Sequence, residues 1–180
     1  MVAALGMLRA TAGARPVTFG DLVREHQDEV FGLALRMLGD RDLAMDVAAT
    51  VFLNAFRAFD RYDHRRPARH WLLRITVNEA VSAARARTRE RGRTADADDA
   101  LVVPDRGVAP DAEAVAREER ERVRAAVAGL EEPYRTVTVL RYFSGLAVEE
   151  IAEVTGRPAS TVGVQLLRAR ARLRATLGPA

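Results

Sequence analysis

The sequence predicts an all-α protein made of two small helical domains joined by a flexible linker. Apolar residues recur at steps of three and four through most of the chain, and no segment shows the strict alternation of a half-buried strand. Residues 90–111 interrupt this spacing with Gly, Pro and acidic residues, which is typical of a linker. We therefore expect a disordered tail at 1–17, a three-to-four-helix bundle at 18–89 and a four-helix domain at 112–177.

Three helices are predicted in the first domain. Thr18 can cap a helix over 18–38, a second helix covers about 41–59, and a third covers about 68–89 after a polar loop at 60–67. Their shared apolar faces would bury a common core. The apolar residues at helical spacing are Phe19, Leu22, Val23, Val30, Leu33, Ala34 and Met37, then Leu43, Val47, Val51, Ala55, Phe56 and Phe59, then Trp71, Leu72, Ile75, Val81 and Ala84.

The second domain is predicted to end in two short helices with a tight break between them. Helices over about 111–129 and 134–142 precede a one-sided segment at 148–154, which Gly156 and Pro158 stop. Ser160 or Thr161 could cap the final helix. One face of that helix carries Val162, Leu166, Ala169 and Leu173, and the opposite face carries Ser160, Thr161, Val164 and Arg168, with Arg172 at its edge.

This arrangement is typical of a helix-turn-helix, whose second helix is shaped to enter the DNA major groove. An ordinary helical hairpin with a solvated polar face would show the same spacing. The charge favours DNA, because residues 157–180 hold five Arg and no acid. Residues 61–93 hold ten Arg against three acids, a net charge of +7, whereas residues 94–121 hold three Arg against nine acids, a net charge of −6. A basic segment followed by an acidic one indicates a polyanionic partner.

Signals of catalysis, of a metal or of a cofactor are absent from the sequence, so we expect a protein that is not an enzyme. The three His residues lack zinc-like spacing, and there is no Gly-rich phosphate loop or nucleophile elbow. The chain contains no Cys, which excludes disulfides and fits a cytoplasmic location. No apolar run approaches the roughly 18 residues that span a bilayer, so no membrane insertion is expected.

Aromatic and basic residues interleave over 56–74, a pattern suited to single-stranded nucleic acid. Phe56 and Trp71 lie on apolar faces and are assigned to the core. The loop residues remain candidates for binding; they are Arg61, Tyr62, His64, Arg65 and Arg66.

Two groups of residues, one in each half of the chain, follow one another in a characteristic order. The first is Asp46-Val47, Val51-Phe52, Phe56, Phe59, Trp71-Leu72, Ile75 and Asn78. The second is Leu130, Arg135-Thr136-Val137, Leu140-Arg141-Tyr142, Glu150-Ile151-Ala152, Gly156, Ser160-Thr161-Val162, Arg168-Ala169-Arg170 and Leu173-Arg174. With them the chain resembles the small two-domain sigma factors of bacterial RNA polymerase, the extracytoplasmic-function group, over about 18–89 and 112–177.

The resemblance implies a promoter-specificity subunit that binds core polymerase and uses no cofactor. The second helix would dock on the clamp coiled coil of the large polymerase subunit through Asp46, Val47, Thr50 and Asn54. The loop and third helix would hold the melted −10 strand through Arg61, Tyr62, Arg65, Arg66, Arg74 and Asn78. The helix-turn-helix would read the −35 duplex through Ser160, Thr161, Val164, Leu167, Arg168 and Arg172. An anti-sigma factor is a further partner that the family implies.

The chain departs from the family pattern at Met45, Ala49, Gly163 and Gln165, where acidic, amide or basic residues are usual. Two other functions therefore remain open at this point. One is a dimeric helix-turn-helix repressor, for which residues 18–89 would need another role. The other is a module that binds polymerase or an inhibitor and has lost DNA recognition.

Overall fold

The computed structural model describes residues 18–63, 66–93 and 111–178, and within them it contains only helices and the segments that join them. The all-α prediction is confirmed. The helices are α1 (Phe19–Leu38), α2 (Arg41–Ala58), η1 (Phe59–Arg61, a 3₁₀ turn), α3 (Ala68–Arg93), α4 (Asp111–Ala128), α5 (Tyr134–Tyr142), α6 (Val148–Thr155) and α7 (Ala159–Leu177). The expected tail and most of the expected linker lie outside these ranges, as do His64 and Arg65.

Local sequence signals account for the helix ends in the first half. The Thr18 hydroxyl accepts a hydrogen bond from the Asp21 amide, and the Asp21 side chain bonds back to the Thr18 amide, which completes a capping box. Gly39 ends α1 at a φ of 67°, a conformation that favours glycine. Asp40 then caps α2 through the Leu43 amide at 3.0 Å.

The boundaries of two elements differ from the prediction. α3 continues to Arg93, so residues 90–93 are helical rather than part of the linker. α7 begins at Ala159 after Pro158, with no side-chain hydrogen bond at its cap, so the prediction that Ser160 or Thr161 caps it is wrong. Pro158 precedes the first helical residue with a φ of −58° and an extended ψ of 141°, and it has no backbone N–H that would need a partner there. Ser160 and Thr161 therefore lie in the first turn of α7.

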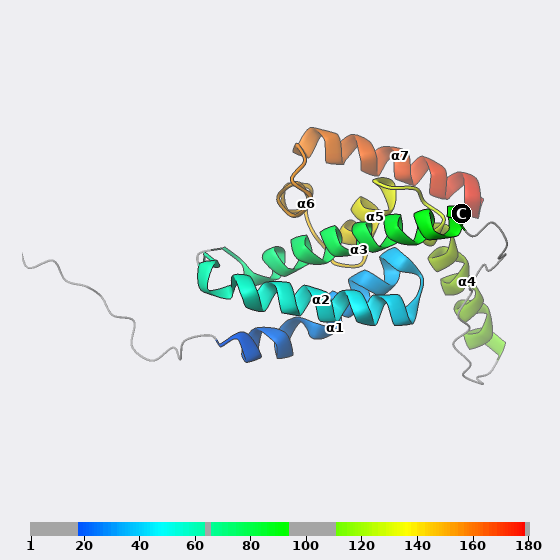
Figure 1. Ribbon diagram of the computed structural model, residues 1–180. Coiled ribbons are helices and arrows are strands. Elements are labelled where there is room, and N and C mark those ends of the chain that lie inside the picture. Colours follow the sequence, from blue (N-terminus) through cyan, green and yellow to red (C-terminus); the bar gives the residue numbers. More distant parts are fainter. Residues whose placement is uncertain (1–17, 64–65, 94–110, 179–180) are drawn as a thin grey trace, which may run out of the picture.

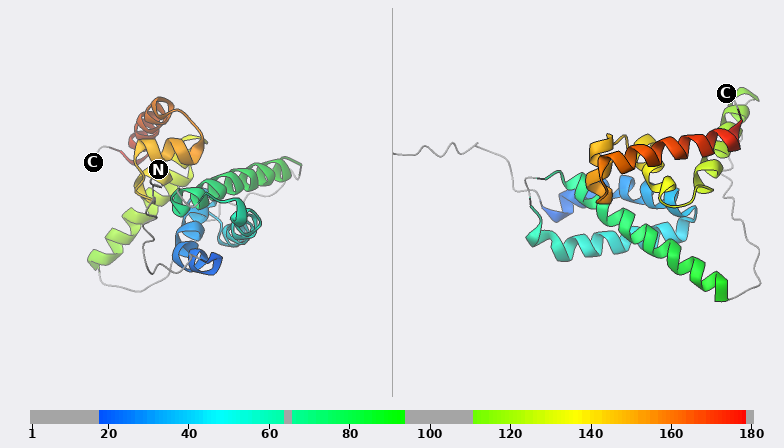
Figure 2. Two further views of the ribbon diagram at one scale, coloured as in Figure 1. Left: turned by 90° about the vertical axis from the view of Figure 1, so that its left-hand side faces the viewer. Right: turned by 90° about the horizontal axis from the view of Figure 1, so that it is seen from above.

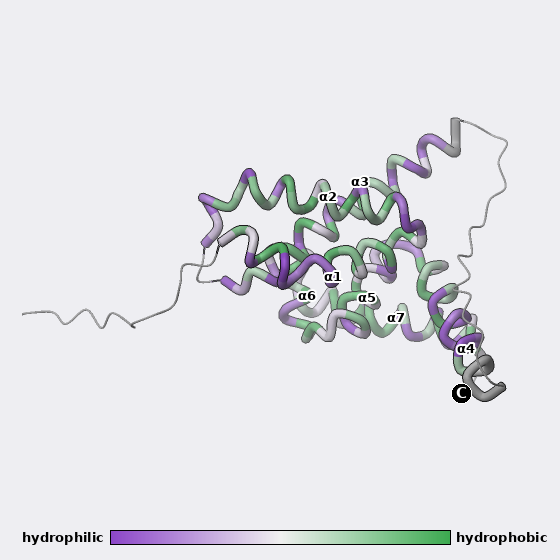
Figure 3. Tube along the Cα trace, turned by 90° about the horizontal axis from the view of Figure 1, so that it is seen from below, coloured by the Kyte–Doolittle hydropathy of each residue, from purple (hydrophilic) through white to green (hydrophobic). Residues whose placement is uncertain are grey.

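The helices form two tiers (Figure 1). Helices α1, α2 and α3 pack against one another, and α5, α6 and α7 lie on the side of this bundle that α1 and α3 present. The views in Figure 2 agree that α6 lies against the start of α3, and α7 packs on α5 and α6. α4 contacts α7, α1 and α5 at its C-terminal end, and its charged outer part appears as a hydrophilic stretch in Figure 3.

Buried side chains from both tiers form one contiguous hydrophobic cluster. Helices α1, α2 and α3, the lower tier, contribute Leu22, Leu33 and Leu72, and helices α5, α6 and α7, the upper tier, contribute Leu140 and Ile151. The sequence predicted two separately folded domains, whereas in the structure their cores meet. No helix in the described part of the chain is both long and apolar enough to cross a membrane.

Candidate nucleic-acid interface

The exposed face of α7 is the strongest candidate for contact with nucleic acid. Val162, Leu166 and Ala169 are buried, as the predicted helix face requires. Gly156 ends α6 at a φ of 66°, which allows the chain to turn sharply into α7. The residues predicted to read DNA lie together on the outer face of α7, and all are exposed: Ser160, Thr161, Val164, Leu167, Arg168 and Arg172.

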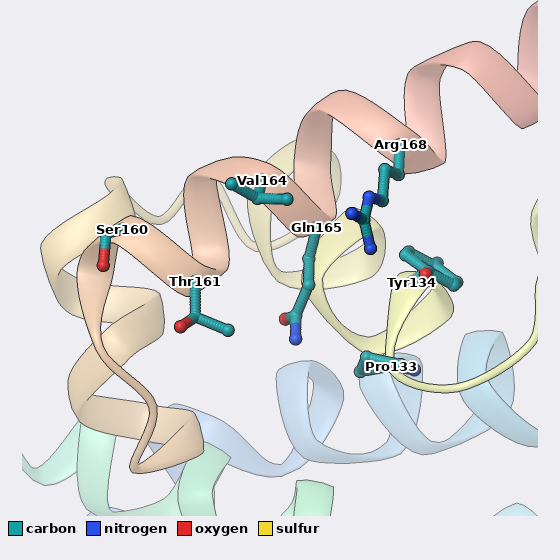
Figure 4. Close-up of a pocket in the computed structure, with 7 residues that line it drawn as sticks. All are labelled: Pro133, Tyr134, Ser160, Thr161, Val164, Gln165 and Arg168. Atoms are coloured by element: carbon teal, nitrogen blue, oxygen red, sulfur yellow. The ribbon is translucent and has the colours of Figure 1, made fainter.

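A shallow open hollow of about 320 Å³ lies between this face and the start of α5 (Figure 4). No acidic residue is among those that line it, which are Pro133, Tyr134, Ser160, Thr161, Val164, Gln165 and Arg168. In Figure 4 the Arg168 side chain points from α7 toward Tyr134. The hollow therefore offers hydroxyl, amide and guanidinium groups to a ligand that approaches α7.

Tyr134 is the residue of this face that the sequence did not single out. The guanidinium carbon of Arg172 lies 4.0 Å from the centre of its ring. A hydrogen bond from Arg168 lowers the pKa of the Tyr134 hydroxyl, and the positive charges of Arg172 and Arg168 act in the same direction. The sequence carried no signal for this residue, because Tyr134 and Arg168 are far apart along the chain.

A second candidate surface surrounds the start of α3. Arg61 and Arg66 are exposed at the ends of the loop, and Arg74 and Asn78 are exposed on α3 itself. Arg65 lies outside the described residues, so its place on this surface stays a prediction. The exposed groups carry positive charge and amide donors, which suit a nucleic-acid backbone and base edges.

Tyr62 is held differently from the other loop residues. Its ring stacks on Trp71 with centroids 4.5 Å apart and on Phe59 at 6.5 Å, and its hydroxyl donates to the Arg66 carbonyl. Burial raises the pKa of Tyr62, and the nearby charge of Asp63 raises it further. Trp71 is only partly buried, so its assignment to the core holds in part. This aromatic stack occupies the faces with which Tyr62 could stack on a base, and instead fixes the loop against α3.

The upper tier covers part of the second surface through polar contacts. We call the contacts of Arg69 and His70 with Ser144, Glu150 and Glu153 the α3–α6 contact. Arg69 of α3 pairs with both oxygens of Glu29 at 2.9 and 3.0 Å and also donates to the Ser144 carbonyl before α6. The His70 ring nitrogens lie 3.2 Å from Glu150 and 3.3 Å from Glu153, both on α6. The Arg74 side chain reaches toward the Gly156 turn.

The outer face of α2 differs from the sequence prediction. Phe56 was assigned to the core, but it is 63% exposed, and its ring packs edge to face with Phe19 with the centroids 5.2 Å apart. Met45 and Leu53 are exposed on the same face, and Leu53 is 49% exposed. Their spacing could have been read as an apolar face, but α2 has apolar residues on two sides, and periodicity does not say which side is covered.

The residues predicted to bind polymerase are divided between this face and the core. Asp46 and Thr50 are exposed, and the Thr50 hydroxyl donates to the Asp46 carbonyl at 2.9 Å. Asn54 is half-buried and donates to Glu79 of α3 at 3.0 Å. Val47 is 5% exposed and packs in the core. As a correction, Val47 is a packing residue that supports this face from beneath.

Neither surface resembles a metal site, since the described residues include no cluster of three or more His, Cys, Asp or Glu side chains that could hold an ion. The exposed groups instead present hydrogen-bond donors and positive charge to a large anionic partner. Two separate surfaces of this kind lie beside the helix-turn-helix and beside the aromatic-supported loop, and their chemistry suits duplex and single-stranded nucleic acid respectively.

Comparisons with known proteins agree with this geometry in both halves of the chain. A family model described as Sigma-70 region 2 matches residues 22–90, and one described as Sigma-70, region 4 matches residues 120–173. The ECF RNA polymerase sigma factor SigW of Bacillus subtilis is 32% identical over 168 residues, which cover 88% of each chain. The RNA polymerase sigma-H factor of Pseudomonas aeruginosa is 34% identical, covering 89% of this chain and 86% of its own.

Solved structures show the same helical architecture. CnrH in complex with the cytosolic domain of CnrY matches with a TM-score of 0.63 and 30% identity, covering 88% of this chain and 86% of that chain. The sigma factor RpoE in complex with the anti-sigma factor NepR from Bartonella quintana matches with a TM-score of 0.71 and 22% identity, covering 88% and 96%. At that identity the second match establishes the fold alone.

Proposed function

The chain belongs to the extracytoplasmic-function sigma factors of bacterial RNA polymerase, and from that premise we propose how its surfaces divide promoter recognition. As a member of this family it directs promoter-specific transcription initiation. In our proposal α7 reads the −35 duplex, and the loop and first half of α3 hold the melted −10 strand. The observation that carries the proposal is the exposed face of α7, which lies opposite its buried face. The hollow beside this face is lined by no acidic residue.

The −35 half of the proposal follows from the chemistry of the α7 face. A helix fits the major groove of B-DNA, where guanine offers two acceptors and thymine a methyl group. Arg168 can donate two parallel hydrogen bonds to guanine, and the exposed side chains of Val164 and Leu167 can contact thymine methyl groups. Ser160 and Thr161 lie in the first turn, where hydroxyls and backbone amides suit a phosphate.

Arg168→Ala is expected to reduce discrimination at one base pair of the −35 element by about 1–3 kcal/mol. Arg168 is exposed, so the fold should be unaffected. The measurement is competition binding with −35 duplexes that carry each single base-pair change. If affinity falls equally for every duplex, Arg168 contacts a phosphate and the proposed base contact is wrong.

The −10 half of the proposal needs groups that hold a separated strand. Arg61, Arg66 and Arg74 supply positive charge for its phosphates, and Asn78 supplies a base-edge donor and acceptor. The stack of Phe59, Tyr62 and Trp71 supports the loop. Binding energy for the captured strand would offset the cost of unstacking, a few kcal/mol per step, so no nucleotide hydrolysis is required.

The −10 surface is partly covered by the upper tier, so we propose that the α3–α6 contact opens before strand capture. Arg69 and His70 lie in that contact between the exposed Arg66 and Arg74. These ion pairs and hydrogen bonds supplement the apolar packing between the tiers, and such polar contacts are exchangeable for similar contacts with polymerase or DNA. The free protein would then be poised to rearrange rather than preformed for both promoter elements.

We propose that the exposed face of α2 binds core polymerase in the clamp region of the large subunit, with Asp46 and Thr50 beside Met45, Leu53 and Phe56. Exposed apolar side chains rimmed by polar ones are typical of a protein interface. Location in the cytoplasm, where polymerase acts, follows from this partner. Binding of an anti-sigma factor is a further part of the proposal, supported by the solved complexes of CnrH with CnrY and of RpoE with NepR.

Leu53→Glu is expected to weaken the binding of core polymerase by at least about tenfold, because a charge would be forced into an apolar contact. Leu53 is half exposed, so the isolated protein should keep its stability within about 0.5 kcal/mol. Surface plasmon resonance with immobilised core enzyme measures the effect. Arg57→Glu, a change at another exposed residue of the same helix, separates the effect of charge from loss of the apolar side chain. Equal binding of Leu53→Glu and the unmodified chain would exclude this face.

Run-off transcription tests the proposed function as a whole. Core polymerase with this chain should produce transcripts from a fragmented genomic library that core polymerase alone does not produce, and their upstream regions should share −35 and −10 elements. Absence of new transcripts with core binding retained would favour a module without promoter recognition. Protection of palindromic DNA without core binding would favour a dimeric repressor.

A further inference from the structure

Tyr134 lies where three features of the −35 face meet. It is the first residue of α5, and it lines the hollow beside α7. The Arg172 guanidinium carbon lies 4.0 Å from the centre of its ring, and the Arg168 side chain points toward it (Figure 4). The two arginines are one turn apart on α7, so they approach the same ring from the same helix. A single side chain of α5 therefore meets Arg172 and faces Arg168, two of the cations on the proposed recognition surface.

We propose that Tyr134 is a positioning residue for −35 recognition: its ring supports Arg172, and its hydroxyl holds the Arg168 guanidinium in the orientation that meets a base edge. The inference rests on the proposed function, because it assumes that Arg168 reads a base. A guanidinium carries five N–H donors. One donor given to the tyrosine leaves a pair free for the two acceptors of guanine.

The backbone that carries Tyr134 is firmly held. Residues Thr136 to Leu140, which continue α5 directly after Arg135, are all buried. The Arg135 side chain donates to the Leu130 carbonyl and to the Met37 carbonyl of α1, each at 2.8 Å. A ring attached to such a rigid element can restrict a long arginine, which would otherwise lose rotamer freedom when it binds DNA.

The chemistry of the tyrosine suits this role better than that of a carboxylate. A carboxylate beside Arg168 would orient the guanidinium but would also cancel its charge, which DNA phosphates attract. A neutral hydroxyl orients the same group and leaves the positive charge available. The absence of acidic residues from the lining of the hollow, together with the lowered pKa of Tyr134, is consistent with a tyrosine that faces two unneutralised cations.

The test compares Tyr134→Phe with a matched control on the same helix. Tyr142 accepts a hydrogen bond from Arg170 at 2.6 Å, and Arg170 also lies 5.9 Å from its ring centre. Tyr142→Phe therefore removes a tyrosine–arginine hydrogen bond away from the recognition face. Both changes keep the aromatic ring, and thermal unfolding of each variant checks that the fold is retained.

The probes are −35 duplexes from a promoter obtained by run-off transcription, each with one base pair changed. Tyr134→Phe is expected to reduce the ratio of affinities at the base pair read by Arg168 by about three- to tenfold, the effect of one hydrogen bond. Tyr142→Phe should leave every ratio unchanged. In a double-mutant cycle, Tyr134→Phe should add no further loss to Arg168→Ala, because the two groups act as one unit.

The outcomes separate this inference from the function on which it rests. If Arg168→Ala removes discrimination but Tyr134→Phe does not, or if the two losses add, the positioning role is overturned and the reading of DNA by Arg168 stands. If Arg168→Ala leaves discrimination intact, both are overturned. Without DNA, ultraviolet titration should show that Arg168→Ala raises the pKa of Tyr134, and an unchanged titration would overturn the contact itself.

Discussion

Arg69→Ala is expected to separate the two tiers of the free protein and to strengthen its binding to a single-stranded −10 oligonucleotide. Arg69 joins three parts of the chain, because it pairs with Glu29 of α1 and donates to the Ser144 carbonyl before α6. The Ser144 bond crosses the α3–α6 contact. Loss of a hydrogen bond from a charged group costs about 1.5–3 kcal/mol, and the partial exposure of this site places the expected effect at about 1–2 kcal/mol.

A loss of this size shifts the equilibrium between closed and open forms by roughly 5- to 30-fold toward the open form. The apparent affinity for the −10 strand rises with the open fraction, up to the same factor when the unmodified protein is mostly closed. Fluorescence anisotropy with a labelled −10 non-template oligonucleotide measures the affinity. Glu153→Gln weakens the contact from the α6 side, through His70, and should act in the same direction but less strongly.

Distance measurements give an independent readout of opening. The chain has no Cys, so Glu25→Cys and Ala171→Cys on α1 and α7 provide unique sites for two spin labels. Arg69→Ala should broaden the distance distribution toward longer values. Arg24→Ala is the control, because it removes an exposed ion pair with Asp21 inside α1 and should change neither distance nor affinity. A weaker −10 affinity with unchanged distances would mean that Arg69 binds DNA and does not restrain closure.

Replacement of two adjacent leucines in α7 is expected to have opposite consequences. Leu166 is 5% exposed and Leu167 is 67% exposed. Leu166→Ala should lower the free energy of unfolding by about 2–5 kcal/mol, because it removes a packed side chain and leaves a cavity. Leu167→Ala should change stability by no more than about 0.5 kcal/mol, because its side chain faces solvent and alanine is the stronger helix former.

The two variants, Leu166→Ala and Leu167→Ala, should also differ in their affinity for DNA, but in the opposite order. Leu167→Ala removes an apolar group that can contact a thymine methyl, so the −35 affinity should fall while the melting temperature is retained. Leu166→Ala should keep its affinity at a temperature where α7 remains folded. Chemical denaturation followed by circular dichroism gives the stabilities, and anisotropy with a −35 duplex gives the affinities. Loss of −35 affinity in the Leu166 variant alone would place the opposite side of α7 against DNA.

The helices of this protein were predictable because their determinants are local. The sequence placed α5 at Tyr134–Tyr142, as the structure has it. Steps of three and four between apolar residues identified the buried face of α7. Thr18 was recognisable as a cap because its partner lies three residues away. The order of motifs in the two halves identified the family, which the matches to residues 22–90 and 120–173 confirm.

The residues whose surroundings the sequence did not predict have a common physical explanation. Phe56 and Val47 both follow the apolar spacing of α2, yet Phe56 faces solvent and Val47 lies in the core. A helix with apolar residues on two sides gives no local indication of which side its neighbours cover. Tyr62 likewise lies in a polar loop by sequence, and only the position of Trp71 on the next helix gives it a stacking partner.

The sequence by itself therefore determined the secondary structure, the helix-turn-helix, the family and the exposed residues of α7, because capping and periodicity act within a few residues. Only the tertiary structure decided that the two tiers share a hydrophobic cluster, that Arg69 and His70 join them, and that Tyr134 meets Arg168. These contacts unite residues that are between 34 and 83 positions apart. Their pairing depends on how whole helices pack, which local propensity does not encode.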